Sequence, residues 1–502
     1  MPSKKDLFST QQLRELNLIK LLSQDKEAFD YKTICRQLDC SFITLQSELA
    51  HLSTFPGISS FPYIESHLTI DYHKAYGPQK LYQSVLLDAP TLRLMESFFF
   101  NECHNLDTLA SNLFISLSTL KRLIKRTNTY LKQTFDCKID IKQFSIVGNE
   151  KQIRLFYLKY FSEAYDKHDW PFDDLVSESA LEDLIHLSAK QLDAPIDYSL
   201  LHHLKIMAGV HLVRFSQGYR VNDVYPLAQD LCHQLEDESA FTDLHDKFET
   251  DFLEPLNCLA LSEMFSAFFL EDVMVNFQKI PLADEDNQKV DFHDWSQLML
   301  TIEKGLPLEI ANKDEICRHL HNATILGDYD IYENFLIYDY RKPFLDYFKS
   351  NYPDLWQSLC DSIEATYDKK GVDMQDKDLN HMLYVLLINW DNLFMQLSNA
   401  ISKQKLLVIE KGSCNVGQFL QGFAGQFFDI TIHQEMDIKK AHIEGKYDLV
   451  LTDVSLEQID GVDVYFFSQL VPSIALAELN KHLKHKIQNR IKLSKNSFYY
   501  LF

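Results

Sequence analysis

Residues 34–47 read ICRQLDCSFITLQS, and residues 109–122 read LASNLFISLSTLKR. The second stretch repeats the spacing of the first 75 positions later. Each copy has a small residue in a first helix and a serine, Ser41 or Ser116, where a second helix would begin. A small residue lets two helices approach closely, and a serine oxygen caps the first amides of a following helix. The repeat therefore predicts two helix-turn-helix modules.

Residues 117–130 are the expected recognition helix of the second module. Apolar side chains recur there with the i, i+3, i+4, i+7 spacing of one helix face. The opposite face carries the candidate DNA contacts Ser118, Thr119, Lys121, Arg122, Lys125 and Arg126. Two alternating stretches, 138–142 and 144–147, are typical of a short hairpin, the wing. From residue 117 to residue 142 there are seven basic and two acidic residues, as a surface facing phosphates requires.

The first module has weaker chemistry for DNA binding. Its second helix carries no Lys or Arg, and its candidate base contacts are Thr44, Gln46 and Ser47. The segment 63–72 is its expected wing. An alternative applies to both copies: a helical hairpin packed inside the protein, with its polar face in solvent.

The composition favours a mostly helical chain of several domains. At 502 residues the chain exceeds one hydrophobic core, and about 150 residues per domain suggests three to five units. Only 14 glycines and 14 prolines are present, fewer than β-sandwiches, barrels or disordered linkers use. With 35 Phe and 24 Tyr, several cores can be filled.

The charge is distributed unevenly along the chain. The net charge is −23, but residues 1–170 carry +2 and the remainder carries −25. Such asymmetry suggests a nucleic-acid-binding N-terminal part attached to a large acidic body.

Several classes of protein lack support in the sequence. No secretory signal and no uncharged apolar run of about 20 residues is present. The nine cysteines form no CxxC pair, so we expect reduced cysteines, no metal site and a cytoplasmic protein without membrane contact. HExxH, GxGxxG, Walker and GxSxG motifs are absent. We therefore expect no catalytic residues, no cofactor and no enzymatic activity.

The expected fold is mainly α, with a small α/β domain at the C-terminus. The acidic region is helical, and a polar stretch at 281–287 divides it into two parts. After residue 402, strands at 406–409, 428–432, 449–452 and 462–466 alternate with helices at 416–426 and 474–491, which indicates a parallel sheet. The predicted domains are 1–75 and 76–172 (winged helix-turn-helix), 173–285 and 286–402 (helical), and 403–502 (α/β).

This order of modules resembles the Mga/AtxA family of Gram-positive transcriptional regulators over essentially the whole chain. The resemblance is carried by residues 7–16 (LFSTQQLREL), 115–122 (ISLSTLKR), 146–150 (IVGNE) and 320–322 (LHN). It implies that the paired helical domains are similar to phosphotransferase regulation domains (PRDs), with phosphocarrier proteins as partners. It also implies an EIIB-like C-terminal domain that supports a homodimer or higher oligomer.

The resemblance further implies phosphorylated histidines. His321 is the first choice because it lies in the Leu-His-Asn match, and His202 or His203 is the second; His211 and His319 compete with them. One departure concerns the EIIB-like domain, where an active cysteine would directly follow the first strand. This chain has Glu410 there, and Cys414 comes four residues later.

The sequence thus predicts a regulator of transcription that binds promoter DNA, an activator linked to virulence or carbohydrate use. Histidine phosphorylation and self-association would tune its activity. Two alternatives remain open: an RNA-binding antiterminator with PRDs, and a phosphotransferase-system component with EIIB-type phosphotransfer.

Overall fold

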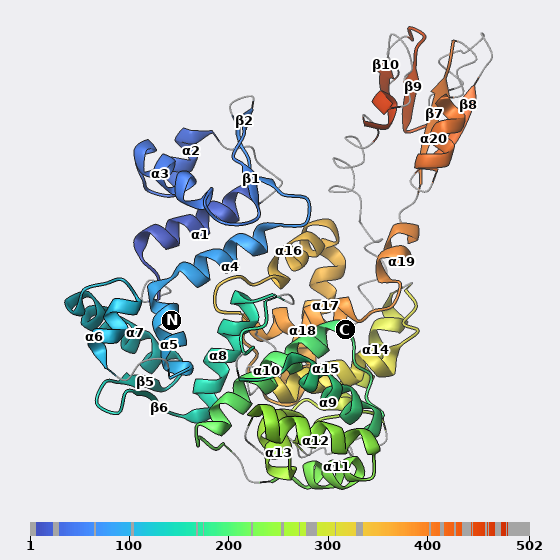
Figure 1. The fold of residues 1–502 in the computed structure, drawn as a ribbon. Coiled ribbons are helices and arrows are strands. Elements are labelled where there is room, and N and C mark those ends of the chain that lie inside the picture. The colour runs from blue at the N-terminus through green and yellow to red at the C-terminus, as the bar shows by residue number, and fades with distance from the viewer. Residues whose placement is uncertain are drawn as a thin grey trace. The chain divides into compact units, whose positions relative to one another are not determined.

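The computed structural model describes residues 7–479 apart from 24–29, 65–66, 102–104, 167–168, 174, 222–223, 253–255, 271, 278–288, 307, 328–334, 401–402, 412–415, 426–427, 434–442, 444, 457–458, 460, 467–472 and 478 (Figure 1). The chain divides into two compact units, residues 1–280 with 325–339 and residues 281–324 with 340–502. The fold is mainly helical, as predicted. The predicted polar break at 281–287, Cys414 and most of the helix expected at 474–491 lie outside the described residues.

The first winged module opens the chain. Its elements are α1 (Thr10–Leu22), α2 (Tyr31–Gln37), α3 (Phe42–Leu52), β1 (Ile58–Ser60), β2 (Tyr63–Ile64), β3 (His67–Leu68) and β4 (Asp71–Tyr72). The wing pairs β2 with β3, and it also pairs β1 with β4. The wing therefore begins at residue 58, five residues before the predicted start. Serine and glycine around β1 hide its strand pattern from sequence reading.

The second winged module follows directly. Its elements are α4 (Pro78–Asp88), α5 (Pro90–Phe99), α6 (Leu106–Asn112), α7 (Leu117–Thr134), β5 (Cys137–Asp140), β6 (Ser145–Gly148) and α8 (Glu150–Ala164). The wing is an antiparallel hairpin of β5 and β6. Its first strand ends at Asp140 rather than at the predicted 142, because the Asp140 carboxylate accepts from the amides of Lys142 (2.8 Å) and Gln143 (3.2 Å) and starts a turn.

The two modules repeat the same local backbone geometry at an offset of 75 residues. The equivalent pairs are the N-caps Asp30 and Asn105, the turn residues Asp39 and Phe114, and the N-caps Ser41 and Ser116. Both turn residues have positive φ, 50° and 54°, which is uncommon outside glycine. Each serine accepts a hydrogen bond from the amide three residues later. The sequence repeat is therefore a structural repeat.

Helices complete the first unit. They are α9 (Glu178–Gln191), α10 (Tyr198–Ser216), α11 (Pro226–Glu236), α12 (Ser239–Phe252), α13 (Cys258–Phe265) and the 3-10 turn η2 (Ser266–Phe269). One apolar core runs from the first winged module to these helices.

Residues 335–339 also pack with the first unit. They belong to the segment 325–339, which is assigned to the first unit although the residues before 325 and after 339 belong to the second. The Glu163 carboxylate at the end of α8 accepts from the amides of Leu336, Ile337 (2.9 Å) and Tyr338 (2.7 Å). The Tyr338 ring stacks on Tyr82 of α4 with centroids 4.4 Å apart.

The second unit combines helices with a sheet. Its elements are α14 (Phe292–Gly305), most of α15 (Lys313–Gly327), α16 (Arg341–Asn351), α17 (Pro353–Lys369), α18 (Asp376–Ile388), α19 (Leu393–Ala400), β7 (Gln404–Ile409), α20 (Val416–Ala424), β8 (Phe428–His433), β9 (Leu449–Thr452) and β10 (Asp463–Phe466). The strand order is β10-β9-β7-β8 and every pairing is parallel, which confirms the predicted α/β sheet. The helix predicted to end at 426 ends at Ala424.

Candidate nucleic-acid interface

Helix α7 presents a polar and basic face over its first three turns. The predicted apolar stripe is buried: Leu120, Leu123, Ile124 and Thr127 are at most 8% exposed. On the other side Ser118, Lys121, Arg122 and Lys125 are exposed, and Thr119 is half-buried beside the capping serine. The helix therefore keeps one face in the core and leaves the other for a partner.

Arg126 differs from the other predicted contacts. Its side chain is half-buried, and an Nη2–H donates to the Thr91 hydroxyl of α5 at 3.1 Å. It lies where the basic face of α7 meets α5. The sequence spacing alone placed it with the exposed cations, because a period of 3.6 does not resolve the edge of a helix face.

The wing is fixed to the recognition helix by Asn128. The side-chain amide of Asn128 donates to the Ile139 carbonyl (3.0 Å), and its oxygen accepts from the Ile139 amide (2.7 Å). This pair holds β5 against α7 and keeps Lys138 and Lys142 exposed on the wing. Sequence reading missed Asn128, although an asparagine between apolar helix positions is a signal of such a contact.

Gly148 closes the wing. Its φ is +143°, and a Cβ there would lie 2.5 Å from the Asp136 carbonyl oxygen. Only glycine fits this close approach of two strands.

The first module offers a different surface. On α3, Gln46 and Ser47 are exposed, while Thr44 is half-buried and shares a 2.8 Å hydrogen bond with the Ser41 hydroxyl. Beside them Ile43 is 78% exposed and Phe42 is 46% exposed. This face is neutral and partly apolar, unlike that of α7.

A buried ion-pair network joins the second module to the helices that follow. Glu150, the first residue of α8, accepts from Arg214 of α10 through Nε (2.9 Å) and Nη2 (2.6 Å), and from Arg154 Nε at 3.1 Å. Arg154 also pairs with Glu263 of α13 at 2.6 Å. Arg154, Arg214 and Glu263 are at most 2% exposed. The network is non-local, and no sequence pattern pointed to it.

The candidate histidines lie in different environments. His321 is only 2% exposed within α15. His202 and His203 are half-buried at the start of α10; burial lowers the pKa of His202 and lowers that of His203 to about 4. All three imidazoles are therefore shielded from solvent to some degree.

In the C-terminal sheet domain, Glu410 follows β7 as predicted from the sequence. Its carboxylate accepts from the Gly417 amide in the first turn of α20. A carboxylate thus fills the position after the first strand and satisfies the helix amide there.

Two winged helix-turn-helix modules, one with a basic recognition helix, define the class of DNA-binding transcriptional regulators. Three family descriptions match the chain: the M protein trans-acting positive regulator (MGA) HTH domain over residues 9–65, the Mga helix-turn-helix domain over 78–161, and the MGA PRD domain over 177–393. The chain belongs to the Mga family of PRD-containing regulators. The resemblance seen in the sequence is confirmed, and the family is one of regulators rather than enzymes.

Curated relatives agree with this assignment. A Streptococcus pneumoniae serotype 4 protein with the provisional name trans-acting regulator is 23% identical over 475 residues, covering 91% of this chain and 94% of that protein. The capsule synthesis positive regulators AcpB and AcpA of Bacillus anthracis are 24% and 21% identical, each over 41% of this chain and 43% of their own length.

Within the described ranges, no helix has the length and apolar character needed to span a membrane.

Proposed function

We propose that this protein regulates transcription by placing α7 in the major groove of promoter DNA. The carrying observation is the exposed face of Lys121, Arg122 and Lys125 on a capped helix with a wing fixed beside it. Lys121 and Lys125 would contact phosphates, and Arg122 with Thr119 and Ser118 would face base edges. Arg126 would not contact DNA itself but would help to position α7 through its hydrogen bond to Thr91 of α5. In the first module Thr44, Gln46 and Ser47 would make neutral contacts.

Phosphate contact by Lys125 predicts a change in salt dependence. Each lost contact lowers the slope of log K against log salt by about 0.9. We expect Lys125→Ala to bind promoter DNA more weakly and with a slope reduced by about one unit, measured by fluorescence anisotropy at several salt concentrations. Lys377→Ala, which removes an exposed lysine of α18, is the matched control. An unchanged slope in Lys125→Ala would exclude this contact.

We propose that the protein acts as a homodimer or higher oligomer and that the C-terminal domain contributes to the contact. Large apolar side chains are exposed there, Phe423 (62%) on α20 and Phe466 (55%) on β10. Two linked DNA-binding surfaces gain affinity through effective concentration. The positive regulation named for the two Bacillus anthracis relatives supports a role as an activator.

Self-association predicts that loss of residues 403–502 shifts the protein toward monomer in sedimentation velocity and lowers activation in cells. Phe423→Ala with Phe466→Ala should act in the same direction within the full chain. Tyr347→Ala, which removes a 52% exposed ring of α16, is the control. A truncated protein that sediments and activates like the full chain would refute the role of this domain.

We further propose that phosphocarrier proteins modify His202, His203 or His321. A phosphoryl group adds up to about two negative charges, which is unfavourable in an acidic body and would shift domain packing by about 1–3 kcal/mol, a 5–150-fold change. His202 and His203 need less opening than His321, since they are half-buried rather than buried. Glu410 supports the view that the EIIB-like domain itself transfers no phosphate.

Incubation with phosphoenolpyruvate and the general phosphocarrier enzymes should give acid-labile label on the wild-type protein. We expect less label in at least one of the three single alanine variants and none in the triple variant. His233→Ala is the control, because that histidine is 74% exposed on α11. If the wild type takes up no label and all variants regulate normally, the switch does not exist.

A further inference from the structure

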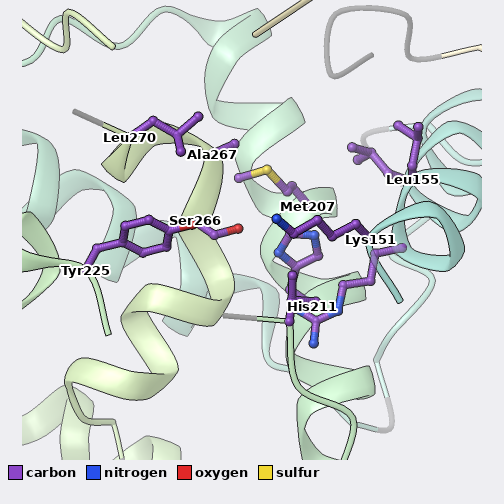
Figure 2. Close-up of a pocket in the computed structure, with 11 residues that line it drawn as sticks. Lys151, Leu155, Met207, His211, Tyr225, Ser266, Ala267 and Leu270 are labelled. Atoms are coloured by element: carbon purple, nitrogen blue, oxygen red, sulfur yellow. The ribbon is translucent and has the colours of Figure 1, made fainter. Parts of the chain in front are cut away.

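A cavity of about 70 Å³ lies where α8 of the second winged module meets α10 and η2. Figure 2 shows lining side chains from three elements: Lys151 and Leu155 from α8, Met207 and His211 from α10, and Ala267 from η2, with Leu270 directly after η2. The walls are mostly aliphatic, and the lining residues that the structure describes include two cations and no carboxylate. An apolar pocket with a few polar groups is the usual form of a small-molecule site.

His211 supplies a hydrogen-bond acceptor to this cavity. Its Nδ1 lies 2.8 Å from the Glu263 carbonyl and 3.0 Å from the Met264 carbonyl, so Nδ1 carries the proton and donates. Burial, with Arg154 nearby, lowers the pKa of His211 to about 3, and the ring is neutral at pH 7. Nε2 of this tautomer is therefore an acceptor, and a hydroxyl group of a ligand can donate to it.

Lys151 supplies the available positive charge. It is exposed, and across the described ranges its ammonium forms no ion pair. Arg154 is different, because Glu150 and Glu263 already pair with its guanidinium. A ligand anion would thus be recognised by Lys151 rather than by Arg154.

We propose that this cavity binds a small aliphatic acid that carries a hydroxyl group. The carboxylate would pair with Lys151, the hydroxyl would donate to His211 Nε2, and the short chain would lie against Leu155, Met207 and Leu270. This ligand site goes beyond the proposed DNA-binding function and does not depend on histidine phosphorylation. Helix α8 begins directly after the wing, and α10 belongs to the region matched by the PRD description. A bound acid that contacts both helices would therefore stabilise one position of α8 relative to α10.

Calorimetric titration of the full chain with 3-hydroxybutyrate tests the proposal, with butyrate and 3-hydroxybutyramide as comparison ligands. We expect 3-hydroxybutyrate to bind more tightly than either, because butyrate lacks the donor and the amide lacks the charge. Lys151→Gln should weaken binding by about tenfold or more, as loss of a charge-assisted hydrogen bond does. Lys20→Gln, an exposed lysine of α1, should bind like the wild type.

His211→Asn gives an independent readout. Its amide can still donate to the Glu263 and Met264 carbonyls, but the ring acceptor is gone, so the preference for 3-hydroxybutyrate over butyrate should disappear. The Met207 methyl resonance, assigned by Met207→Leu, should shift on binding to the wild type. No heat and no shift, equal binding of the three ligands, or wild-type affinity in Lys151→Gln would each overturn the proposal.

Discussion

Replacing both Lys121 and Arg122 by alanine should abolish specific DNA binding by the full chain. Both side chains are exposed near the start of α7, and within the described part of the chain neither makes a hydrogen bond or ion pair. A good base or phosphate contact is worth about 1–3 kcal/mol, so the two together correspond to a loss of affinity of at least about 30-fold. Electrophoretic mobility shift on promoter DNA measures this loss.

The same double variant should unfold like the wild type, since exposed positions without partners change stability by less than about 0.5 kcal/mol. Lys369→Ala with Lys377→Ala removes the same charge from exposed positions on α17 and α18 and should retain wild-type affinity. If the variant with both Lys121 and Arg122 replaced binds DNA like the wild type, α7 does not form the DNA interface.

Breaking the buried ion pair between Glu150 and Arg214 should lower the free energy of unfolding more than any other substitution proposed for this protein. Arg214→Met leaves the Glu150 carboxylate without its bidentate partner, and among the described residues only Arg154 remains to pair with it. Removing one member of a buried pair costs about 3–5 kcal/mol. Amide hydrogen exchange of α8 and α10, followed by mass spectrometry, should accelerate by about 100-fold or more.

Two controls separate pairing from general damage. Lys190→Met breaks a pair with Glu238 in which the lysine is 69% exposed, and it should change exchange by less than about fivefold. Glu150→Leu with Arg214→Met removes both charges and should recover part of the loss. If Arg214→Met exchanges like the wild type, this network does not hold α8 to α10.

Local signals explain what the sequence predicted. The helix-turn-helix repeat rests on contacts within about five residues, such as the Ser116 cap and the turn at Phe114, and spacing alone encodes them. The parallel sheet was likewise predictable, because β7 and β9 are short apolar runs between helical patterns.

Non-local contacts explain what the sequence did not predict. Glu150 and Arg214 are 64 residues apart, and Glu163 and Leu336 are 173 apart; neither pair leaves a periodic trace. The burial of His321 depends on which side of α15 faces the core, and tertiary packing decides that. The partial burial of Arg126 has the same origin, since α5 approaches α7 at the edge of its exposed face.

Hydroxyl-radical footprinting of the full chain, on DNA upstream of the neighbouring genes, measures where the protein binds. A recognition helix with a wing beside it predicts a discrete protected segment, with contacts in one major groove and in the adjoining backbone. That protection should be lost with Lys121→Ala and Arg122→Ala and retained with Lys369→Ala and Lys377→Ala. A wild-type footprint that persists unchanged in the α7 variant would contradict DNA recognition by the second module.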